Sequence, residues 1–495
     1  MNYFLAGLLT CFFSIGAVLA QDKKTNYMDS PMRKLQLAEY AIANLYVDKT
    51  DENKLVESAI VGMLKELDPH STYSNAEEVK RMNEPLQGNF DGIGIQFNMT
   101  TDTLFVIQPV SGGPSEKVGI RAGDRITHVN DTLIAGVKMS TEDVMRRLKG
   151  PKGTKVKVKV LRKGVNELLS FEIKRDKIPV YSLDASYMIT PKIGYIKINR
   201  FGATTHEEFM EALARLKGQG LQDLILDLQG NGGGYLNAAI DIANEFLGAG
   251  ELVVYTEGRR NPRNEFFAKG DGKHQYGKLV VLVDDYSASA SEIVAGAVQD
   301  WDRGVVVGRR TFGKGLVQQQ IPFADGSAVR LTVARYYTPS GRCIQKPYTL
   351  GDQEDYAMDL IDRFEHGEFY SADSVHFADS TVYLTKKGRV VRGGGGIMPD
   401  IFVGRDTTLY TPYFNQVVNR AYTYQFAYQY TDRHRKELSQ YKDWQSLEKH
   451  LLDANWIPEF VAFAKEKGVE PNPEQLAKSK PLLVRLVNAY IVRNI

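Results

Sequence analysis

The sequence predicts a multi-domain α/β protein with a helical region near each end. Three observations lead to this prediction. The chain has 495 residues, which at roughly 150 residues per domain suggests about three domains. Short apolar segments alternate with helical stretches in its middle, and the apolar spacing near both ends is helical. Apolar residues make up 43% of the chain, enough for a sizeable core and too many for a disordered protein.

Charge and cysteine content exclude several classes of protein. Lys and Arg number 62 and Asp and Glu 60, which gives a net charge of +2, so we expect no nucleic-acid partner. The two cysteines, Cys11 and Cys343, exclude a disulfide scaffold and a multi-cysteine metal site. The eight histidines include no His-Glu-x-x-His pair. We therefore expect no metal and no cofactor.

Residues 1–20 are predicted to be a signal peptide. They contain no charged side chain, are apolar from Phe4 to Leu19, and end in Val18-Leu19-Ala20, which suits signal peptidase. The chain is thus expected to be periplasmic or otherwise exported. No Lys or Arg precedes the apolar run, so an uncleaved membrane anchor stays open, and Thr10-Cys11 makes lipidation a weaker alternative.

Two different modules follow the signal segment. Residues 21–87 are predicted to form a helical module, whose second helix stops at Asp68-Pro69. Residues 88–165 are predicted to form a compact, mostly β module, because strand-like runs are broken by Gly and Asp turns. One amphipathic helix is expected at Thr141 to Lys149, with Ser140 as its cap.

Residues 166–405 are predicted to be the α/β core, with a polar insertion at about 350–392. The expected strands and helices alternate; the strands are 193–198, 223–228, 279–283, 304–307 and 328–337, and the helices are 205–219, 238–247 and 290–300. Residues 406–495 are predicted to be helical. Alternating aromatics there fit either an oligomerisation arm or ordinary packing: Tyr422, Tyr424, Phe426, Tyr428 and Tyr430.

Two segments of the core combine small residues with groups suited to catalysis. Four glycines between positions 230 and 234 follow an apolar strand, and they let backbone N–H groups approach a ligand, although a flexible turn is the simpler alternative. Ser287-Ala288-Ser289-Ala290-Ser291-Glu292 opens a helix of small residues. A hydroxyl there suits a nucleophile whose transition state carries an oxyanion. The alternative is that Ser289 and Glu292 only form a capping box.

A third segment places a lysine on a Gly-flanked turn. Residues 308–315 nearly match a phosphate-binding P-loop, but Gly315 stands where Ser or Thr should hold magnesium, and the residues after Lys314 favour a strand. A nucleotide-binding enzyme is thus the weaker alternative. A buried Lys can act as a general base once burial lowers its pKa. On a strand, Lys314 and Gln318 would project from one face, so that the amide orients the amine. Together the segments indicate a Ser–Lys hydrolase.

At these residues the sequence resembles the carboxy-terminal processing (tail-specific) serine proteases over about residues 30–405. The matching motifs are residues 287–292, residues 311–315 with Gln318, Tyr-Tyr-Thr-Pro-Ser-Gly-Arg at 336–342 and Gly-Ile-Met-Pro-Asp at 396–400. The resemblance implies an α/β core of the crotonase/Clp-like kind. It also implies that Ser289 is the nucleophile, Lys314 the general base and Gln318 the residue that orients the lysine.

The same resemblance implies an oxyanion hole formed by the backbone N–H groups of Gly233 and Ala290, and it aligns Asp300 with an acidic residue implicated in some members. Two positions depart from the family pattern: Gln229 stands where many relatives have Arg or a polar residue, and Gly232 where many have Pro. Both changes lie in the glycine-rich loop. Cys343 occupies a common Ser position and is interpreted as a packing residue.

The β module resembles a PDZ domain. Asp91-Gly92-Ile93-Gly94-Ile95 matches the carboxylate-binding loop, and residues 119–126 match the Gly-Asp-x-Ile segment. Residues Gly92, Ile93, Gly94 and Ile95 are thus expected to bind the free C-terminus of a peptide, which adds as a strand along 93–97.

The sequence therefore predicts an exported serine endopeptidase that recognises apolar free C-termini of protein or peptide substrates and cleaves through an acyl-enzyme. The competing hypothesis is a catalytically silent PDZ adaptor that only captures protein tails. A homo-oligomer through the C-terminal helical region is a further expectation.

Overall fold

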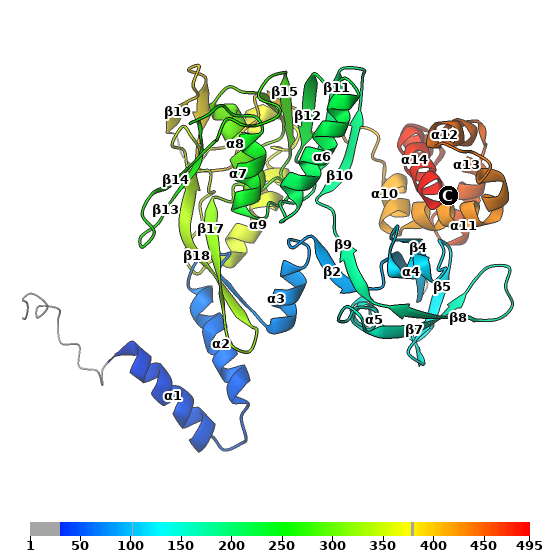
Figure 1. The fold of residues 1–495 in the computed structure, drawn as a ribbon, viewed down its shortest axis with the longest axis horizontal. Coiled ribbons are helices and arrows are strands. Elements are labelled where there is room, and N and C mark those ends of the chain that lie inside the picture. The colour runs from blue at the N-terminus through cyan, green and yellow to red at the C-terminus, as the bar shows by residue number, and fades with distance from the viewer. Residues whose placement is uncertain (1–29, 101, 378–380) are drawn as a thin grey trace, which may run out of the picture.

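A computed structural model describes residues 30–100, 102–377 and 381–495. The predicted signal peptide, including Cys11, lies outside these residues. In Figure 1 the α/β core forms one lobe, while the β module and the C-terminal helices lie together in a second lobe. Among the described helices, none is both long and apolar enough to span a membrane.

The core is built on a six-stranded sheet of order β10-β11-β12-β15-β16-β21. Its strands from β11 onward are parallel, and β10 pairs antiparallel at one edge. The central strands are continuous apolar runs because helices cover them. The strands are β10 (Leu183–Met188), β11 (Ile193–Ile198), β12 (Asp223–Asp227), β15 (Leu279–Val283), β16 (Val305–Gly308) and β21 (Ile401–Phe402), and the helices are α6 (Thr205–Gly218), α7 (Leu236–Asn244) and α8 (Ala290–Asp300).

A second core sheet has the order β1-β18-β13-β14, with β17 paired to β18. Its strands are β1 (Thr72–Ser74), β13 (Leu252–Glu257), β14 (Asn264–Phe267), β17 (Leu316–Pro322) and β18 (Ala328–Tyr337). The N-terminal region is helical as predicted, and it also contributes one strand to this sheet. It contains α1 (Pro31–Leu45), α2 (Glu52–Lys65) and α3 (Ala76–Asn83), but β1 between them pairs with β18 and joins this region to the core.

The β module is a sheet of order β3-β4-β5-β7-β8, with β6 paired to β5. It contains β3 (Ile95–Thr100), β4 (Thr103–Pro109), α4 (Pro114–Lys117), β5 (Arg125–Val129), β6 (Thr132–Leu133), α5 (Thr141–Leu148), β7 (Lys155–Leu161) and β8 (Leu169–Lys174). The predicted boundary at 165 falls inside the β7–β8 hairpin. The segment 166–179, which the predicted boundary assigns to the core, contains β8 and then β9 (Asp176–Pro179), which pairs with β2 (Asn89–Gly92).

The insertion at about 350–392 packs against the core. It contains α9 (Gln353–Glu365), the short helix η2 (Ala372–Ser374) and the hairpin β19 (Val382–Leu384) with β20 (Val390–Arg392). Some of its charged residues are buried: the Glu368 carboxylate pairs with Arg310 of the core and with Arg363 of α9. The polar composition of the insertion thus reflects a buried ion-pair cluster as well as a solvent-exposed surface.

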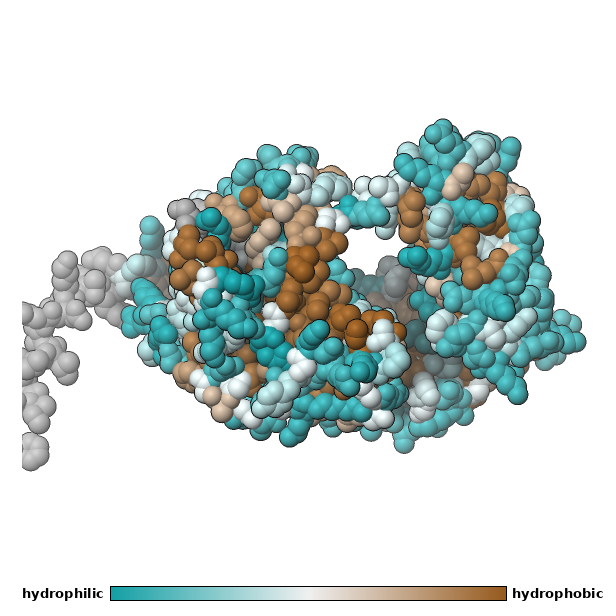
Figure 2. All heavy atoms as spheres, turned by 90° about the horizontal axis from the view of Figure 1, so that it is seen from above, coloured by the Kyte–Doolittle hydropathy of each residue, from teal (hydrophilic) through white to brown (hydrophobic). Residues whose placement is uncertain are grey.

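The C-terminal region consists of α10 (Pro412–Asn419), α11 (Tyr422–Leu438), α12 (Trp444–Asp453), α13 (Ile457–Glu466) and α14 (Pro473–Asn494). It has its own apolar core, which includes Phe426, Tyr430 and Trp456. Tyr428 instead contacts Phe105 of β4, with ring centroids 3.9 Å apart. Figure 2 shows the two lobes with an open gap between them, and a band of hydrophobic surface on the core lobe runs towards it.

Candidate active site

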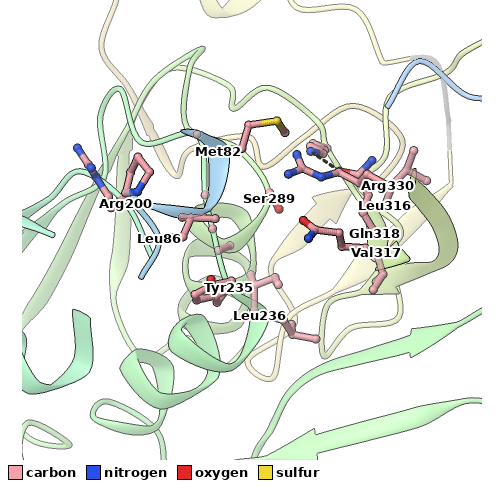
Figure 3. Close-up of a pocket in the computed structure, with 18 of the residues that line it drawn as sticks. Met82, Leu86, Arg200, Tyr235, Leu236, Ser289, Leu316, Val317, Gln318 and Arg330 are labelled. Atoms are coloured by element: carbon pink, nitrogen blue, oxygen red, sulfur yellow. Dashed lines mark hydrogen bonds between the residues drawn. The ribbon is translucent and has the colours of Figure 1, made fainter. Parts of the chain in front are cut away.

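A pocket of about 670 Å³ lies where the end of α3, the loop after β12, the start of α8 and strands β17 and β18 meet (Figure 3). It is lined by all five residues singled out for catalysis in the sequence: Gly233, Ser289, Ala290, Lys314 and Gln318. Met82, Leu86, Tyr235 and Leu236 surround Ser289 with largely apolar surface. Segments far apart in sequence therefore meet around one serine.

Ser289 immediately precedes α8 and has the unusual backbone angles φ 57° and ψ −112°. Residues with side chains seldom occupy this region, and they do so mainly where the surrounding structure holds them for a function. Every residue of α8 is buried, so the helix N-terminus behind Ser289 is fixed. The Ala290 N–H has no acceptor among the described residues, which leaves it free to bind a developing oxyanion.

Glu292 joins the serine segment to the lysine segment. Its buried carboxylate accepts hydrogen bonds from the N–H groups of Ser289 (2.8 Å), Gly313 (2.7 Å) and Lys314 (2.8 Å) and from the Thr311 hydroxyl (2.5 Å). Burial raises the pKa of the Glu292 carboxyl, and these four bonds oppose that rise. From the sequence, Glu292 was interpreted only as part of a capping box, so its contacts with the lysine segment were missed.

Lys314 is half-buried and donates from Nζ to Gln318 Oε1 at 3.1 Å. Burial first, and then the positive charge of Arg330, lower the pKa of the Lys314 amine, while Glu292 and Asp68 oppose the shift. The expected reason for the Lys–Gln contact was wrong: Lys314 lies before β17 begins, and the register shifts between Val317 and Gln318. A bulge, rather than regular strand alternation, brings the two side chains together.

Sequence reasoning missed the residue that anchors Gln318. The Gln318 amide donates to the backbone carbonyl of His70 at 2.5 Å, and the His70 ring bonds to the Tyr356 hydroxyl at 2.9 Å. Burial, followed by the charge of Lys314, lowers the pKa of His70 to about 4. His70 is thus neutral near pH 7. Its segment was interpreted only as a helix stop, and no local pattern in the sequence links it to Gln318.

Tyr336 is a second missed residue, although it lies in a recognised motif. It lines the pocket, and its hydroxyl donates to the backbone carbonyl of Lys314. The Gly315 N–H next to the lysine donates to Gln345 Oε1 at 2.8 Å. The lysine backbone is therefore held on both sides.

The glycine-rich loop touches the serine directly. A Cβ on Gly233, which has φ +99°, would lie 2.8 Å from the Ala288 carbonyl oxygen and from Ser289 Cβ. Only glycine fits there. The Gly233 N–H, implied as an oxyanion donor, donates to Asn231 Oδ1 at 2.9 Å in this structure. It becomes available to a substrate only if the Asn231 amide shares or releases it.

The structure shows the surroundings of the two departures in this loop. A Cβ on Gly232 would meet nothing within 4 Å, so the loop does not need glycine at that position for space. Near Gln229, the amine of Lys197 contacts Asp227 Oδ2 at 3.1 Å and the Gln229 carbonyl oxygen at 2.9 Å. A lysine on β11 thus supplies positive charge beside the loop.

Other residues singled out in the sequence lie away from the chemistry. Asp300 is buried at the far end of α8, where it pairs with Arg342 at 2.7 Å. Burial raises the pKa of the Cys343 thiol, which fits a packing role. The P-loop alternative is disfavoured, because a strand rather than a helix follows Lys314 and Asp227 is paired with Lys197.

A second, smaller pocket of about 70 Å³ lies between β3 and α5 of the β module. Its lining includes Gly92, Ile93, Gly94 and Ile95, together with Phe97, Met145, Leu148 and Lys149. β3 is an edge strand of its sheet, so its free side can accept a further strand. The residues expected to bind a peptide C-terminus therefore line one groove.

Comparisons with known proteins agree with this geometry. Residues 192–357 match peptidase family S41, 92–174 a PDZ domain, 14–78 the activating protease CtpB N-terminal domain, and 413–495 a family of unknown function. The carboxy-terminal processing protease CtpA of Bacillus subtilis is 37% identical over 358 residues, which cover 71% of this chain and 76% of that protein. The chain belongs to the carboxy-terminal processing proteases.

Further relatives of this family are similar over the same region. The carboxy-terminal-processing protease of Bartonella bacilliformis is 36% identical over 352 residues, covering 69% of this chain and 79% of that protein. A solved photosystem II D1 C-terminal processing protease is 29% identical, with a TM-score of 0.36, over 64% of this chain and 90% of that one. The family and the fold class expected from sequence, including the PDZ domain, are confirmed.

Proposed function

We propose that this carboxy-terminal processing protease is an exported endopeptidase that captures protein tails in its PDZ groove and cleaves with a Ser289–Lys314 dyad. One observation carries the proposal: Ser289 and a lysine with a lowered pKa line one pocket, and Glu292 bonds to the backbone of both. A lysine that can be neutral beside a serine at a helix N-terminus is suited to nucleophilic catalysis.

The first half-reaction forms an ester. Ser289 Oγ attacks the scissile carbonyl carbon while neutral Lys314 takes the hydroxyl proton. The Ala290 N–H stabilises the oxyanion of the tetrahedral intermediate, with the Gly233 N–H once Asn231 shares it. The intermediate collapses, the C–N bond breaks, and Lys314 returns the proton to the leaving amine. The product is an acyl-enzyme on Ser289.

The second half-reaction frees the enzyme. Lys314 takes a proton from water, the resulting hydroxide attacks the ester carbonyl, and the proton returns to Ser289 Oγ as the acid product leaves. Gln318 supports both steps, because its oxygen accepts from Lys314 while its amide is held by the His70 carbonyl. The lysine amine is thereby kept in one position.

The PDZ groove provides the substrate's second contact. Backbone N–H groups around Gly92 to Ile95 would hold a terminal carboxylate, and the apolar side chains of Phe97, Met145 and Leu148 would hold the last side chain. Proteins that end in an apolar residue with a free carboxylate are the proposed substrates.

Cleavage of an unstructured protein tests the proposal against the silent-adaptor alternative. Ser289→Ala and Lys314→Ala should each remove nearly all turnover, because the residues of such a unit act together. Both variants should still bind a tail peptide, and Ser439→Ala, at an exposed serine far from the pocket, should cleave as wild type does. Binding without cleavage in the wild type would establish the adaptor, and Lys314→Ala activity within a few-fold of wild type would exclude the lysine base.

Export is proposed from residues 1–20 and is tested separately. The protein should appear outside the cytoplasm when expressed with its own N-terminus. N-terminal sequencing after fractionation would show whether cleavage follows Ala20. Recovery in the cytoplasm with Met1 intact would contradict this part of the proposal.

A further inference from the structure

Two arginines without partners line the catalytic pocket. Arg200 precedes the segment that pairs with the glycine-rich loop, and Arg330 lies on β18. Figure 3 shows them on opposite sides of Ser289. Among the described residues, neither guanidinium has a hydrogen bond or an ion pair with another group, although both side chains are half-buried.

The rest of the lining offers these charges no compensation. No Asp or Glu occurs among the described residues that line the pocket, and its third positively chargeable group is Lys314. The buried Glu292 nearby is already occupied by four hydrogen bonds. Burial lowers the pKa of Arg330, and no ion pair among the described residues compensates for this loss of hydration.

A half-buried cation that lacks a partner gains most from a ligand that supplies one. The guanidinium binds carboxylates through two parallel N–H···O bonds, so a carboxylate is the group that best complements it. Because both arginines line the pocket that contains Ser289 and lie on opposite sides of it in Figure 3, we expect the two arms of a substrate bound with its scissile bond at Ser289 to run near one arginine each. Carboxylates on either side of that bond would therefore meet Arg200 or Arg330.

We propose that Arg200 and Arg330 are specificity-determining residues that bind substrate carboxylates on the two sides of Ser289, so that the enzyme prefers acidic segments at its cleavage site. This inference rests on the proposed function. It adds a selection by charge at the scissile bond to the selection of an apolar tail by the PDZ groove. The carboxylate can come from an internal Asp or Glu or from a chain end that lies close to the bond.

Paired peptides test the inference. A neutral, C-terminally amidated parent peptide is cleaved and its scissile bond mapped by mass spectrometry, and Glu or Gln is then placed at each of the three positions on either side. In the wild type, kcat/KM should favour Glu over Gln at one or more positions by about tenfold, the effect of one charge-assisted hydrogen bond. The ratio is compared at several pH values, because the ionisation of Lys314 affects both peptides alike.

Variants assign the preference to each arginine. Arg330→Met should bring the Glu/Gln ratio at its position close to one, and Arg330→Lys should keep most of it. Arg200→Met should do the same at a position on the other side of the bond. Arg335→Met is the matched control, because Arg335 lies exposed on the same strand outside the pocket, and it should leave every ratio unchanged.

A second pair of peptides separates the two sources of the carboxylate. Neutral peptides with only two or three residues after the scissile bond are compared as free acid and amide. In one outcome, the wild type prefers the free acid while its Glu/Gln ratios are close to one. If Arg330→Met or Arg200→Met then removes the preference for the free acid, that arginine binds the carboxylate of the chain end. Equal rates for all pairs in the wild type, or ratios that persist in both Met variants, would overturn the inference. If the wild type cleaves none of these peptides, with or without a carboxylate, the proposed function itself fails.

Discussion

Arg330 bears on the chemistry as well as on the substrate, because its charge helps to lower the pKa of Lys314. Since only the neutral amine can accept the serine proton, kcat/KM for a neutral peptide should rise from pH 5 towards pH 9. His70, with a pKa of about 4, stays neutral over this range, so the rise reports the lysine. Arg330→Met removes a positive charge, raises the pKa of Lys314, and should move the rise to higher pH.

The measurement is a pH–rate profile for wild type and variant with the same amidated peptide. Arg335→Met again serves as the control, and its profile should coincide with that of the wild type. A profile that is flat from pH 5 to 9, or a shift to lower pH in Arg330→Met, would contradict a lysine base tuned by Arg330.

Glu292 allows a second prediction for a single residue. In Glu292→Gln the side chain keeps one oxygen but turns an N–H₂ group towards donors that were facing a carboxylate. Breaking such a buried network should lower the free energy of unfolding by about 3 kcal/mol and reduce kcat more than tenfold. Denaturant unfolding and steady-state kinetics measure the two effects.

The control for this substitution is Glu265→Gln, which changes an exposed glutamate paired with Arg263 and should alter neither quantity appreciably. A Glu292→Gln enzyme with wild-type kcat would show that the carboxylate does not position the dyad. A loss of stability alone, with kcat retained in the folded fraction, would assign Glu292 a purely structural role.

At the scale of elements, the parallel strands and helices of the core were predictable because each is a local pattern of apolar residues. The position of β1 was not: Thr72–Ser74 is three residues long, and only its pairing with β18 makes it a strand. The contact of Gln318 with His70 spans 248 positions and leaves no local pattern. The boundary at 165 was placed too early, because β8 joins the β module only through its pairing with β7.

The turn before β1 is expected to hold Gln318, and through it Lys314, in position. Asp68 is buried and accepts from the His70 N–H (3.0 Å) and from the hydroxyls of Ser71 (2.5 Å) and Thr332 (2.8 Å). In Asp68→Ala these donors lose their acceptor, so the free energy of unfolding should fall by about 2 kcal/mol. Because the His70 carbonyl anchors Gln318, kcat for a short peptide should fall while KM stays nearly constant.

Asp325→Ala is the matched control, since this exposed carboxylate lies in the turn that joins β17 to β18 and bonds only within it. Its kcat should equal that of the wild type. If Asp68→Ala lost stability but kept kcat, the turn would support the fold without positioning Gln318.

At the scale of the whole molecule, the PDZ domain is joined to the core by a paired ribbon and to the C-terminal helices by side-chain contacts. The ribbon is β2 with β9. On the other side, Tyr428 packs on Phe105, and Lys163 Nζ bonds to the Asp432 carbonyl oxygen at 2.8 Å. The aromatics of α11 thus pack within the second lobe, and an oligomer through this region stays a prediction.

One ion pair connects the PDZ groove to the catalytic pocket. Lys149 lines the groove, and its amine contacts Glu84 at 2.6 Å. The neighbours of Glu84 on both sides, Asn83 and Pro85, line the catalytic pocket. We therefore expect a tail that displaces the Lys149 amine to release the segment 83–85, which lines the catalytic pocket at its two ends.

The last prediction follows from this link. Amidating the C-terminus of a substrate with an apolar last residue should raise KM, because the PDZ groove loses its contact with the carboxylate. It should also lower kcat if tail binding rearranges the segment 83–85. Met145→Trp should abolish the difference between the two ends by filling the groove. It is preferable to a bulky residue at Gly94, where φ is +70° and a Cβ would lie 2.9 Å from Ile178 of β9, so that a change there would disturb the ribbon as well.

Glu84→Gln separates the binding of the tail in the PDZ groove from the effect of that binding on the catalytic pocket, because Glu84 lines neither pocket. A partly exposed ion pair contributes about 1 kcal/mol, so removing it should raise kcat for the amidated peptide a few-fold while the effect of amidation on KM remains. Glu142→Gln, which breaks the exposed Arg81–Glu142 pair between the same two elements, should change neither constant. Equal kcat and KM for the free and amidated ends in the wild type would contradict tail recognition and leave the PDZ domain only a structural role as a spacer. A kcat effect of amidation that survives in Glu84→Gln would place the coupling elsewhere, with the β2–β9 ribbon as the remaining connection to the core.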